Sequence, residues 1–525
     1  MSLKLMLEEV AVRYGGKTAI VSGDRRLSYA DLDEVSNKVA NALVKLGVNK
    51  GDRVVMLLSN SPEFVTIYFG IIKTGAIAVP LDTSYKVDEL ASLFDDCLPK
   101  ILVAESPTLE PLIPVLSRFK SIKQVIDLSS EDREHFLSYR EIMAVSPAQK
   151  IEPGPEPADI ASIAYTSGPS FRPEGVMLPH HCLVTEATVS GDGFQQTDRD
   201  IVLLYALPMH HAFGLVSGLL VSVCKGSTLV IVPGTGLSIS SAMVAIEKEE
   251  VTIFLGVPYV FALALNMAKK EGVKSDLTSL RLCASAGASL PVDIIRQFKK
   301  YYGFDILDCW GLTEAVCLVT CPPIDGSGKL GSAGKAMSAW EVKIVDDEGS
   351  ELPPNQAGEI IVRGLVMQGY YNNPQATTEV IRDGWFYTGD IGKVDRDGYL
   401  FITGRKKDII IVKGQNIRPS DIEGVLHTHP KVAEAAVIGV PDELRGEMVM
   451  AVIRLKKGEV ATEQEIRRFC LECIANYKVP KQVTFLNSLP KTAAGEIDKE
   501  SIRDCLSIPP LFPEGALPLV NGIAP

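Results

Sequence analysis

The chain has 525 residues, which at ~150 residues per domain predicts more than one domain. Hydrophobic residues make up 46% and charged residues 22%, so global disorder is excluded, and the net charge of −12 argues against a binder of nucleic acid or anionic lipid. The two most apolar stretches, Ile201–Met209 and Phe213–Cys224, are shorter than the ~18 residues that span a bilayer. Because Met1–Arg13 also lacks an apolar signal-peptide core, we expect a soluble cytoplasmic protein.

Up to about Trp340, short apolar segments alternate with amphipathic helices such as Pro62–Thr74. This alternation predicts an α/β fold with helices packed on largely parallel sheets. The expected strands are Arg53–Leu58, Lys100–Ala104, Gln124–Leu128, Ile160–Tyr165, Asp200–Leu207, Ser227–Val232, Val251–Gly256 and Leu280–Ala286.

Beyond Trp340 the pattern changes to hairpin-like segments and then alternates again, ending in a helix around Phe469. The tail Ser507–Pro525 is rich in proline and glycine, and we expect it to be loosely held. The expected β segments of this part are Glu341–Val345, Gly358–Arg363, the β-rich stretch Gly384–Val412, Val432–Val440 and Glu447–Leu455.

Ten cysteines are too few for a disulfide scaffold in a chain of this length. Cys470 and Cys473 form a CxxC pair within Thr462–Tyr477, where apolar residues recur at helical spacing. We expect the pair to belong to a helix core, and a redox or metal role is the alternative.

Two small-residue loops follow expected strands. Ile160–Gly175 (IASIAYTSGPSFRPEG) ends a strand in Thr166, Ser167 and Gly168, whose hydroxyls and backbone N–H groups suit a phosphate. An ordinary strand-to-turn junction is the alternative. Ala284–Leu290 (ASAGASL) lets a planar ligand approach the backbone closely.

Aromatic and acidic residues gather in two further segments. Asp308–Glu314 (DCWGLTE) offers an aromatic face for a base, a hydroxyl for a phosphate and a carboxylate for Mg²⁺, although a tryptophan at a strand end can also be core. Tyr387–Asp390 (YTGD) places a carboxylate after a tight glycine turn, as expected for binding two ribose hydroxyls.

Basic residues cluster where the β-rich segments end. Phe401–Asp408 (FITGRKKD) places Arg405 and Lys407 on a polar link, for which a solvated loop is the alternative. In the following segment, Ile409–Glu423, Gly414 is flanked by a lysine and a glutamine, and a helix is expected to begin near Pro419.

Several short motifs follow one another along the chain, and their order and spacing outweigh the alternative interpretation of each single segment. The motifs are TSG…PxG, LPMHHAFG, AGASLP, WGLTE, YTGD, GRKKDIII, KGQNI and LPKTAAGE. In these motifs the chain resembles the adenylate-forming enzymes: acyl-CoA synthetases, firefly luciferase and the adenylation domains of peptide synthetases. The resemblance extends from about Tyr14 to Ile502. HHAFG and VPYVFALAL are most similar to the fatty-acyl and arylacrylate CoA ligase branch, and the absence of a following carrier domain disfavours a peptide synthetase.

The resemblance implies a large N-terminal domain of α/β sheets with a β-barrel-like subdomain, and a small mobile α+β C-terminal domain. The expected bounds are 1–403 for the adenylate- and acyl-binding domain, 404–408 for a hinge, 409–506 for the C-terminal lid and 507–525 for the tail. It also implies an AMP-forming ligase that joins a fatty or aromatic acid to CoA, using ATP and Mg²⁺. The expected partner is the small-molecule acid, and the enzyme is expected to be a monomer or homodimer.

The family pattern assigns a role to each matching position. Thr313 would touch the α-phosphate, Glu314 would hold Mg²⁺, and His211 would lie near the reacting carboxylate. Lys407 matches the hinge about which the small domain rotates, and the Lys413–Gln415 loop would then enter the site with Gly414 lining the pantetheine path. The remaining nucleotide-binding positions are Thr166, Ser167 and Gly168 for phosphate, Gly287, Ala288 and the stacking Trp310 for adenine, Asp390 and Arg405 for ribose, and Asp308 as a further cofactor-binding residue.

Two loops depart from the family pattern. The phosphate loop usually reads TSGTTGxPKG, and here Pro169, Phe171 and Glu174 replace threonine, glycine and lysine. The C-terminal loop usually ends in a lysine that bridges the carboxylate and the α-phosphate, and Glu496 occupies that position. A glutamate at ~4 Å from the negatively charged substrates would repel them, whereas the family's lysine attracts them. This change predicts that the rate of adenylation is lower by a factor on the order of 10³ or more. The candidate replacement cations are Arg172, Lys491 and Lys499.

Three hypotheses therefore remain. The first is a complete acid–CoA ligase with a slowed first half-reaction. The second is a half-enzyme that converts a supplied acyl-adenylate to acyl-CoA, or runs the reverse direction. The third is a pseudoenzyme that binds a nucleotide or an acyl group in a regulatory or scaffolding role.

Overall fold

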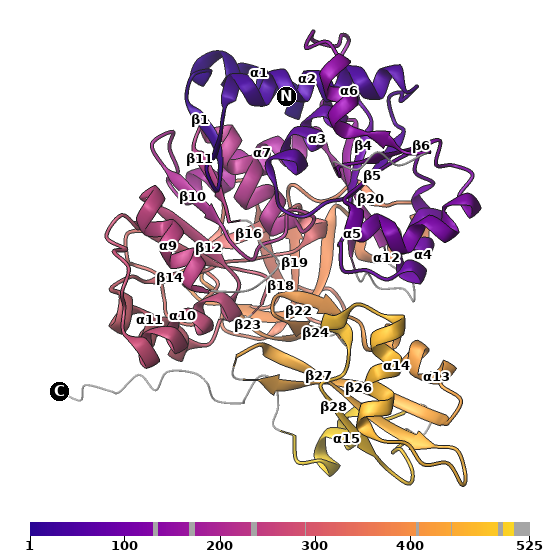
Figure 1. Cartoon of the computed structure of the whole chain (residues 1–525). Helices are drawn as coiled ribbons and strands as arrows, with labels where there is room; N and C mark the ends of the chain where they lie inside the picture. The colour runs from indigo at the N-terminus through magenta and orange to yellow at the C-terminus, as the bar shows by residue number, and fades with distance from the viewer. Residues whose placement is uncertain are drawn as a thin grey trace, which may run out of the picture.

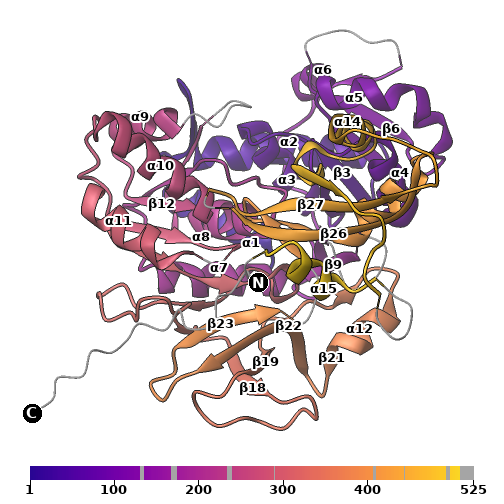
Figure 2. The same cartoon turned by 90° about the horizontal axis from the view of Figure 1, so that it is seen from below.

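The computed structural model describes residues 1–129, 135–166, 174–232, 239–288, 290–405, 409–442, 444–491 and 497–508. A large body, coloured indigo to orange in Figure 1, stands above a smaller domain coloured orange to yellow. We call the second part the small domain, and it comprises the elements from β24 to α15. Seen from below, the small domain lies across the body between α4 and α10 (Figure 2).

The first sheet of the body has eight strands, and it is parallel from β8 to β7 with β9 and β20 added antiparallel at one edge. Every residue of β4 and β5 is buried, as expected for parallel strands covered on both faces. The strand order is β20 (Gly369–Tyr370), β9 (Glu174–Pro179), β8 (Ile160–Thr166), β4 (Ile77–Pro80), β3 (Arg53–Leu57), β5 (Ile101–Ala104), β6 (Gln124–Asp127) and β7 (Leu137–Ser138).

The second sheet of the body has seven strands, which are parallel except for β2. The carboxyl ends of β14, β13, β12 and β10 therefore form one row, and ligands of open α/β sheets bind at such an edge. The strand order is β14 (Ile306–Asp308), β13 (Leu282–Ser285), β12 (Ile253–Gly256), β10 (Ile201–Leu204), β11 (Thr228–Ile231), β1 (Thr18–Ser22) and β2 (Arg25–Ser28).

Antiparallel sheets follow, which confirms the expected change of pattern near Trp340. The larger sheet comprises β18 (Glu341–Val345), β19 (Gly358–Arg363), β22 (Trp385–Val394), β21 (Ile381–Arg382) and β23 (Leu400–Arg405). The smaller one comprises β15 (Trp310–Gly311), β16 (Leu318–Cys321) and β17 (Lys335–Ala336).

The small domain has its own sheet and its own apolar core. Cys470 is fully buried in that core, which confirms the helix-core interpretation of the CxxC pair. Among the described residues, no cluster of His, Cys, Asp and Glu is arranged to hold a metal ion. The elements are β25 (Gln415–Ile417), β24 (Ile410–Val412), β27 (Gly446–Leu455), β26 (Val432–Asp442), β28 (Gln482–Phe485), α13 (Pro419–Thr428), α14 (Glu463–Cys473), η4 (Asn476–Lys478) and α15 (Lys499–Cys505).

The helices of the body cover both sheets, and none in the described part of the chain is long and apolar enough to cross a membrane. They include α1 (Leu3–Tyr14), α2 (Tyr29–Lys45), α3 (Pro62–Lys73), α4 (Val87–Cys97), α5 (Ser106–Leu109), η1 (Glu110–Arg118), α6 (Tyr139–Val145), α7 (His180–Gly193), the π-helix η2 (Phe213–Leu220), α8 (Val221–Lys225), α9 (Ile239–Glu249), α10 (Pro258–Glu271), α11 (Val292–Tyr302), η3 (Thr313–Ala315) and α12 (Pro374–Val380).

Candidate active site

The loop after β13 lies against a turn of the small domain. The backbone at Gly287 has a φ of +84°. A Cβ placed there would lie 3.6 Å from the carbonyl oxygen of Gly414 and 3.7 Å from Cγ1 of Val257. The ASAGASL loop and the KGQNI turn, far apart in the sequence, are therefore in contact at the carboxyl edge of the seven-stranded sheet. Ala288 is half-buried beside Gly287.

The turn that reaches this loop is a tight hairpin between β24 and β25. Lys413 and Gly414 are its two central residues, with φ values of +53° and +80°, and Val412 pairs with Gln415 across it. Positive φ at both central residues is the geometry of a type I′ turn. A Cβ at Gly414 would come within 2.5 Å of Val257, and Lys413 Nζ lies 4.5 Å from the ring centroid of Tyr259. The turn is thus seated at the start of α10.

The DCWGLTE and YTGD segments meet in the interior. Trp310 is only 6% exposed, and its Nε1 donates a hydrogen bond of 2.9 Å to Oδ2 of Asp390. Gly311 has to be glycine, because a Cβ would lie 1.8 Å from the carbonyl oxygen of Cys317. Asp390 in turn pairs with Arg405 across β22 and β23, while the side chain of Arg405 lies outside the described part. Asp308 ends β14 on the same edge, and burial raises its pKa.

Glu314 is held by a tyrosine from another part of the body. The hydroxyl of Tyr370 donates a hydrogen bond of 3.0 Å to Glu314 Oε1, and the backbone N–H of Met367 binds the Glu314 carbonyl at 2.8 Å. Burial and the charges of Glu314 and Glu174 raise the pKa of Tyr370, so its hydroxyl remains a donor. Thr313 is half-buried at the start of the same short helix.

The phosphate-loop strands place Glu174 in the interior. Thr166 ends β8 opposite Glu174, which is 4% exposed and accepts a hydrogen bond of 3.0 Å from Nδ2 of Asn373. The charge of Glu174 acts on Arg418 of the small domain, where it opposes the lowering of the arginine pKa by burial. The glutamate at the family's lysine position is therefore buried in the body. Ser167, Gly168, Pro169, Phe171 and Arg172 lie outside the described residues.

A half-buried asparagine holds the LPMHHAFG segment in place. Asn60 donates to the carbonyl of Leu207 at 2.7 Å and accepts from the N–H of Met209 at 2.8 Å. His211 Nδ1 accepts from the N–H of Phe213 at 3.4 Å, and burial, with His210 nearby, lowers the pKa of His211 to about 4. His211 is therefore neutral near pH 7, with its proton on Nε2.

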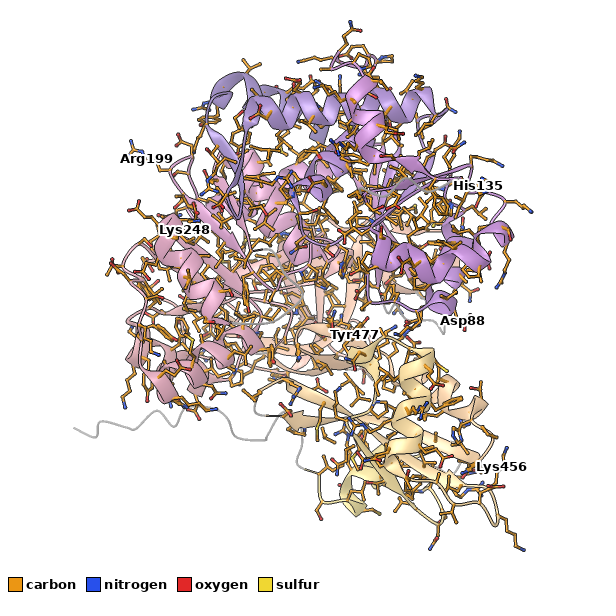
Figure 3. All side chains as sticks on the ribbon, in the orientation of Figure 1. Asp88, His135, Arg199, Lys248, Lys456 and Tyr477 are labelled. Carbon is orange, nitrogen blue, oxygen red and sulfur yellow. The ribbon has the colours of Figure 1, made fainter. Side chains whose placement is uncertain are left out.

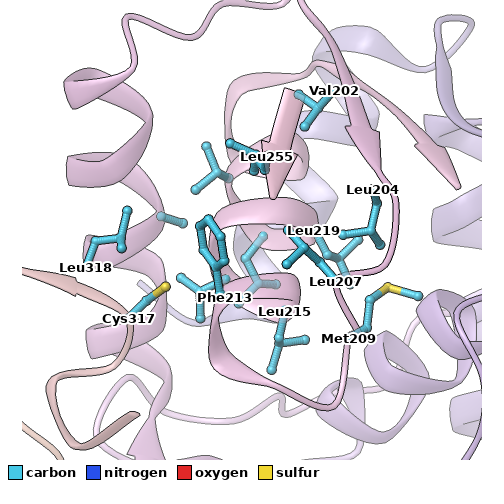
Figure 4. Packing of buried hydrophobic residues seen from close by; sticks show 14 of the residues in the cluster. Val202, Leu204, Leu207, Met209, Phe213, Leu215, Leu219, Leu255, Cys317 and Leu318 are labelled. Carbon is cyan, nitrogen blue, oxygen red and sulfur yellow. The ribbon is translucent and has the colours of Figure 1, made fainter. Parts of the chain in front are cut away.

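The π-helix that follows forms a buried apolar wall. Figure 4 shows Phe213, Leu215 and Leu219 of this helix packed with residues of β10 and β12, and with Cys317 and Leu318. Gly214 is required at its start, because a Cβ would lie 2.2 Å from the carbonyl oxygen of Pro208. π-helical turns are rare and are often found at functional sites.

Charged and aromatic contacts join the small domain to the body. Glu89 of α4 accepts from Lys478 Nζ at 2.5 Å and from the backbone N–H of Ala475 at 3.1 Å. Lys478 Nζ also lies 4.9 Å from the ring centroid of Tyr85, and Figure 3 shows the adjacent Tyr477 at the boundary between the body and the small domain. The small domain is thus held at the boundary through η4 as well as through its turn.

Lys407 and Glu496 lie outside the described residues. Two of the candidate replacement cations form ion pairs within the small domain: Lys491 with Glu434 at 2.8 Å and Lys499 with Glu423 at 2.9 Å.

The sequence did not predict Asn60 or Tyr370 as site residues. Asn60 binds a carbonyl 147 residues away, and Tyr370 binds a carboxylate 56 residues away. Local spacing carries no signal for such contacts.

Comparisons with known proteins show the family to which the chain belongs. The AMP-binding enzyme family matches residues 7–371, and the AMP-binding enzyme C-terminal domain matches residues 421–496. The chain is 34% identical to the indoleacetate–CoA ligase of Aromatoleum aromaticum, covering 97% of this chain and 98% of that protein. It is 32% identical to a long-chain-fatty-acid–CoA ligase of Bacillus subtilis, covering 94% and 93%.

Two solved structures are similar over nearly the whole chain. The o-succinylbenzoate CoA synthetase of Bacillus subtilis bound to a product analogue, OSB-NCoA, has a TM-score of 0.85 at 29% identity, covering 95% of this chain and 98% of that one. The anthranilate CoA ligase with anthranoyl-AMP has a TM-score of 0.76 at 30% identity, covering 97% of each. The fold is therefore that of these enzymes. The chain belongs to the AMP-binding, adenylate-forming enzymes, in their acyl- and aryl-CoA ligase branch.

Proposed function

We propose that the protein is an ATP-dependent ligase that joins a fatty or aromatic carboxylic acid to CoA through an acyl-adenylate. The observation that carries the proposal is the contact of the Lys413–Gly414 turn with Gly287 and Val257. It brings the loop assigned to thioester formation to the loop assigned to adenine. The relatives act on acids, as their names indicate: indoleacetate, long-chain fatty acids and oxalate.

The first half-reaction activates the acid. A carboxylate resists attack by a thiol because the leaving group would be oxide. Its oxygen instead attacks the α-phosphate of ATP, and pyrophosphate leaves with the electrons of the broken P–O bond. We assign Trp310 and Asp308 to adenine, Asp390 and Arg405 to ribose, and Thr313 to the α-phosphate.

Mg²⁺ would be held by Glu314. Magnesium in nucleotide sites is bound by one or two carboxylates together with the substrate phosphates, so a single glutamate fits that role. Tyr370, which bonds Glu314 Oε1 at 3.0 Å, would fix the carboxylate orientation. The ion would offset the negative charge of the leaving pyrophosphate.

The second half-reaction forms the thioester. The CoA sulfur attacks the acyl carbon, the bond to the phosphate oxygen breaks, and AMP leaves. We assign Gly414 to the pantetheine path, with Lys413 and Gln415 on either side. The proposed domain bounds are 1–403 and 409–506, with a hinge at 404–408 containing Lys407. Neutral His211 would lie near the reacting carboxyl group as a donor through Nε2.

A half-enzyme is the second candidate, and the setting of Glu174 favours it. At the family's lysine position the chain has a buried carboxylate, that of Glu174. A carboxylate there repels the phosphates of ATP, and Glu496 would add a second repulsion in the adenylation arrangement.

Pyrophosphate exchange with a panel of fatty and aromatic acids tests the proposal. Exchange with at least one acid, together with acyl-CoA formation, supports the complete ligase. No exchange with any acid, but CoA-dependent consumption of synthetic acyl-adenylate, leaves only the half-enzyme. Loss of both activities with retained AMP binding would identify a pseudoenzyme.

A Glu496→Lys variant tests the account of the first half-reaction. Restoring the cation should raise pyrophosphate exchange on the order of 10³-fold if the C-terminal loop still docks. CoA-dependent consumption of acyl-adenylate, which does not use that loop, should not change. An unchanged exchange rate would contradict the electrostatic explanation.

A further inference from the structure

We propose that Tyr259 is a positioning residue for thioester formation: its ring binds the ammonium group of Lys413 and so holds the Lys413–Gly414 turn at the site. The inference rests on the proposed function, because it assigns this contact to the second half-reaction. In this role Tyr259 acts through the turn and need not touch a substrate.

The turn is strained at Lys413. The backbone there has a φ of +53°, in the left-handed region that is disfavoured for residues with a Cβ. Type I′ turns therefore prefer asparagine, aspartate or glycine at their central positions. Lysine lacks the short polar side chain with which asparagine and aspartate bond the backbone of such turns. Strained backbone persists only where surrounding contacts hold it, so this turn needs support from outside itself.

Tyr259 provides a contact of this kind. Lys413 Nζ lies 4.5 Å from the centroid of the Tyr259 ring, within the ~6 Å over which an aromatic face attracts a cation. Both residues are half-buried, and the attraction strengthens as water is removed. Within the described part of the chain the ammonium group forms no ion pair with a carboxylate, so the aromatic ring is the partner that holds it.

The ring is presented by a rigid part of the body. Tyr259 lies in the first turn of α10, and the next two residues, Val260 and Phe261, are fully buried in the core. Val257 caps the same end of this helix, and it is the residue that Gly414 approaches. The start of α10 therefore seats both central residues of the turn, one against an aliphatic side chain and the other against an aromatic ring.

The contact joins the two domains. Lys413 belongs to the hairpin of β24 and β25 in the small domain, whereas Tyr259 belongs to the body. Any rotation of the small domain that withdraws the turn also separates the ammonium group from the ring. An attraction that is present in one arrangement alone shifts the equilibrium toward that arrangement. The contact therefore supports the half-reaction in which the turn lies at the site.

Substitution of the ring tests this role. Tyr259→Leu removes the aromatic face and should lower CoA-dependent consumption of the adenylates of indole-3-acetate and palmitate about fivefold, as expected for a half-buried cation–π contact. Tyr259→Phe keeps the face and should retain the rate to within about twofold. Pyrophosphate exchange should not fall in either variant. No loss in Tyr259→Leu, an equal loss in both variants, or an equal fall in both half-reactions would overturn the proposal.

A substitution on the other side of the contact tests whether the two residues act together. Lys413→Met removes the cation and should lose at least a similar factor, and adding Tyr259→Leu to it should cost at most about twofold more, because the contact is already gone. Lys335→Met is the matched control, since Lys335 Nζ lies 4.6 Å from the ring centroid of Tyr399 wholly within the body. It should leave both half-reactions unchanged. Losses that multiply in the double variant would mean that Lys413 and Tyr259 act separately, and would contradict the proposal.

Pantetheine separates this role from binding of the CoA phosphates, because it carries the thiol without the nucleotide. If Tyr259 acts by holding the turn, Tyr259→Leu should lose about the same factor with pantetheine as with CoA. A loss confined to CoA would mean that the ring places Lys413 for the phosphates instead, and the proposal would be wrong.

Amide hydrogen exchange of the 412–417 segment provides a readout that does not depend on activity. Tyr259→Leu and Lys413→Met should each speed exchange there about fivefold, whereas Tyr259→Phe and Lys335→Met should leave it unchanged. If the wild type makes no acyl-CoA from acid or adenylate, the proposed function fails, and this readout still decides whether the ring holds the turn. Equal protection in the wild type and all four variants would mean that it does not.

Discussion

Glu186 of α7 is a fully buried carboxyl group in the core of the body. Ser190 Oγ and the N–H of Leu318 donate to its Oε1 at 2.7 and 3.1 Å, and Trp340 Nε1 donates to Oε2 at 3.3 Å. Burial outweighs these hydrogen bonds and raises the pKa of Glu186 to about 8. The folded protein therefore keeps a proton there that the unfolded chain loses near its ordinary pKa of 4.5.

This difference makes stability depend on pH. The stabilisation is complete below the unfolded pKa and is lost as pH rises toward about 8, at roughly 1.4 kcal/mol per pH unit. Glu186→Gln cannot ionise, so it should be less stable than the wild type by about 1 kcal/mol at pH 5.5 and more stable than it by about 2 kcal/mol at pH 8.5. Urea unfolding followed by tryptophan fluorescence measures the free energy of unfolding of the body at each pH, because all three tryptophans lie in the body. A deficit independent of pH would contradict the assigned pKa.

Tyr205 and Tyr302 give a matched pair of buried phenols. The hydroxyl of Tyr302 donates to the carbonyl of Ala264 at 2.7 Å, whereas the buried hydroxyl of Tyr205 has no hydrogen-bond partner among the residues that the structure describes. Tyr302→Phe should therefore lower the free energy of unfolding by about 1 kcal/mol, and Tyr205→Phe should leave it unchanged or raise it by up to about 1 kcal/mol. Equal losses in the same urea experiment would show that Tyr205 does have a partner.

At the scale of residues, the sequence predicts which motifs carry chemistry but not how they are joined. Trp310 and Asp390 were both expected at the nucleotide, and their hydrogen bond links two motifs 80 residues apart. Asn60 was not expected, because an asparagine before a helix is typical of an ordinary loop. Contacts of this kind depend on tertiary packing, which local periodicity does not encode.

At the scale of elements, apolar runs predicted most strands of both parallel sheets. Ile160–Tyr165 and Val251–Gly256 were expected, and the strands are Ile160–Thr166 and Ile253–Gly256. The expected strand Asp200–Leu207 ends at Leu204, because the backbone takes a positive φ of +55° at Ala206. The π-helix was not predicted, since a short uniformly apolar run has no distinctive period.

The hairpin between β24 and β25 requires a glycine at position 414, because the backbone there has a positive φ and lies close to Val257. Gly414→Ala adds a Cβ at 2.5 Å from Val257 and carries the strain of a φ of +80°. It should lower CoA-dependent consumption of acyl-adenylate at least about 10-fold, because a left-handed non-glycine residue alone costs about 1–2 kcal/mol. Pyrophosphate exchange should not fall, since the turn acts in the second half-reaction.

Gly446 provides the control for this variant. It has a similar φ of +79° in the same sheet, but its nearest contact for a Cβ is the carbonyl oxygen of Ile411 at 3.9 Å. Gly446→Ala should cost stability without a selective loss of thioester formation. Combining Gly414→Ala with Val257→Ala should recover part of the rate. No recovery would mean that backbone strain, not the contact with Val257, is responsible.

At the scale of the whole molecule, the sequence predicts two domains but not their mutual placement. The small domain is complete in itself, because its sheet and apolar core are formed without the body. Its position instead depends on a few polar contacts, among them those of Glu89 with Lys478 and Ala475. Their residues appear in the sequence as ordinary surface charges on helices.

Glu89→Gln should therefore act on the arrangement of the domains. The amide keeps an acceptor for the Ala475 N–H but loses the ion pair with Lys478, so adenylate consumption should fall about 3- to 10-fold. Glu63→Gln is the control, because it breaks an ion pair with Arg25 that lies wholly within the body. Equal effects of the two variants would contradict a role for Glu89 at the boundary.

Combining Glu89→Gln with Gly414→Ala tests whether the contacts of η4 and of the hairpin turn act on the same docking equilibrium of the small domain. If the rate follows the docked fraction, and each variant lowers the docking constant independently, the double variant must lose at least the product of the two single losses. The losses multiply when the docked state is rare. When the docked state dominates, the first variant lowers the docked fraction only slightly. The second variant then acts on an already smaller docking constant and lowers the docked fraction more, so the combined loss exceeds the product of the single losses. Initial rates of adenylate consumption in the four proteins decide the matter, and a combined loss smaller than the product would mean that the two residues do not act independently on domain docking.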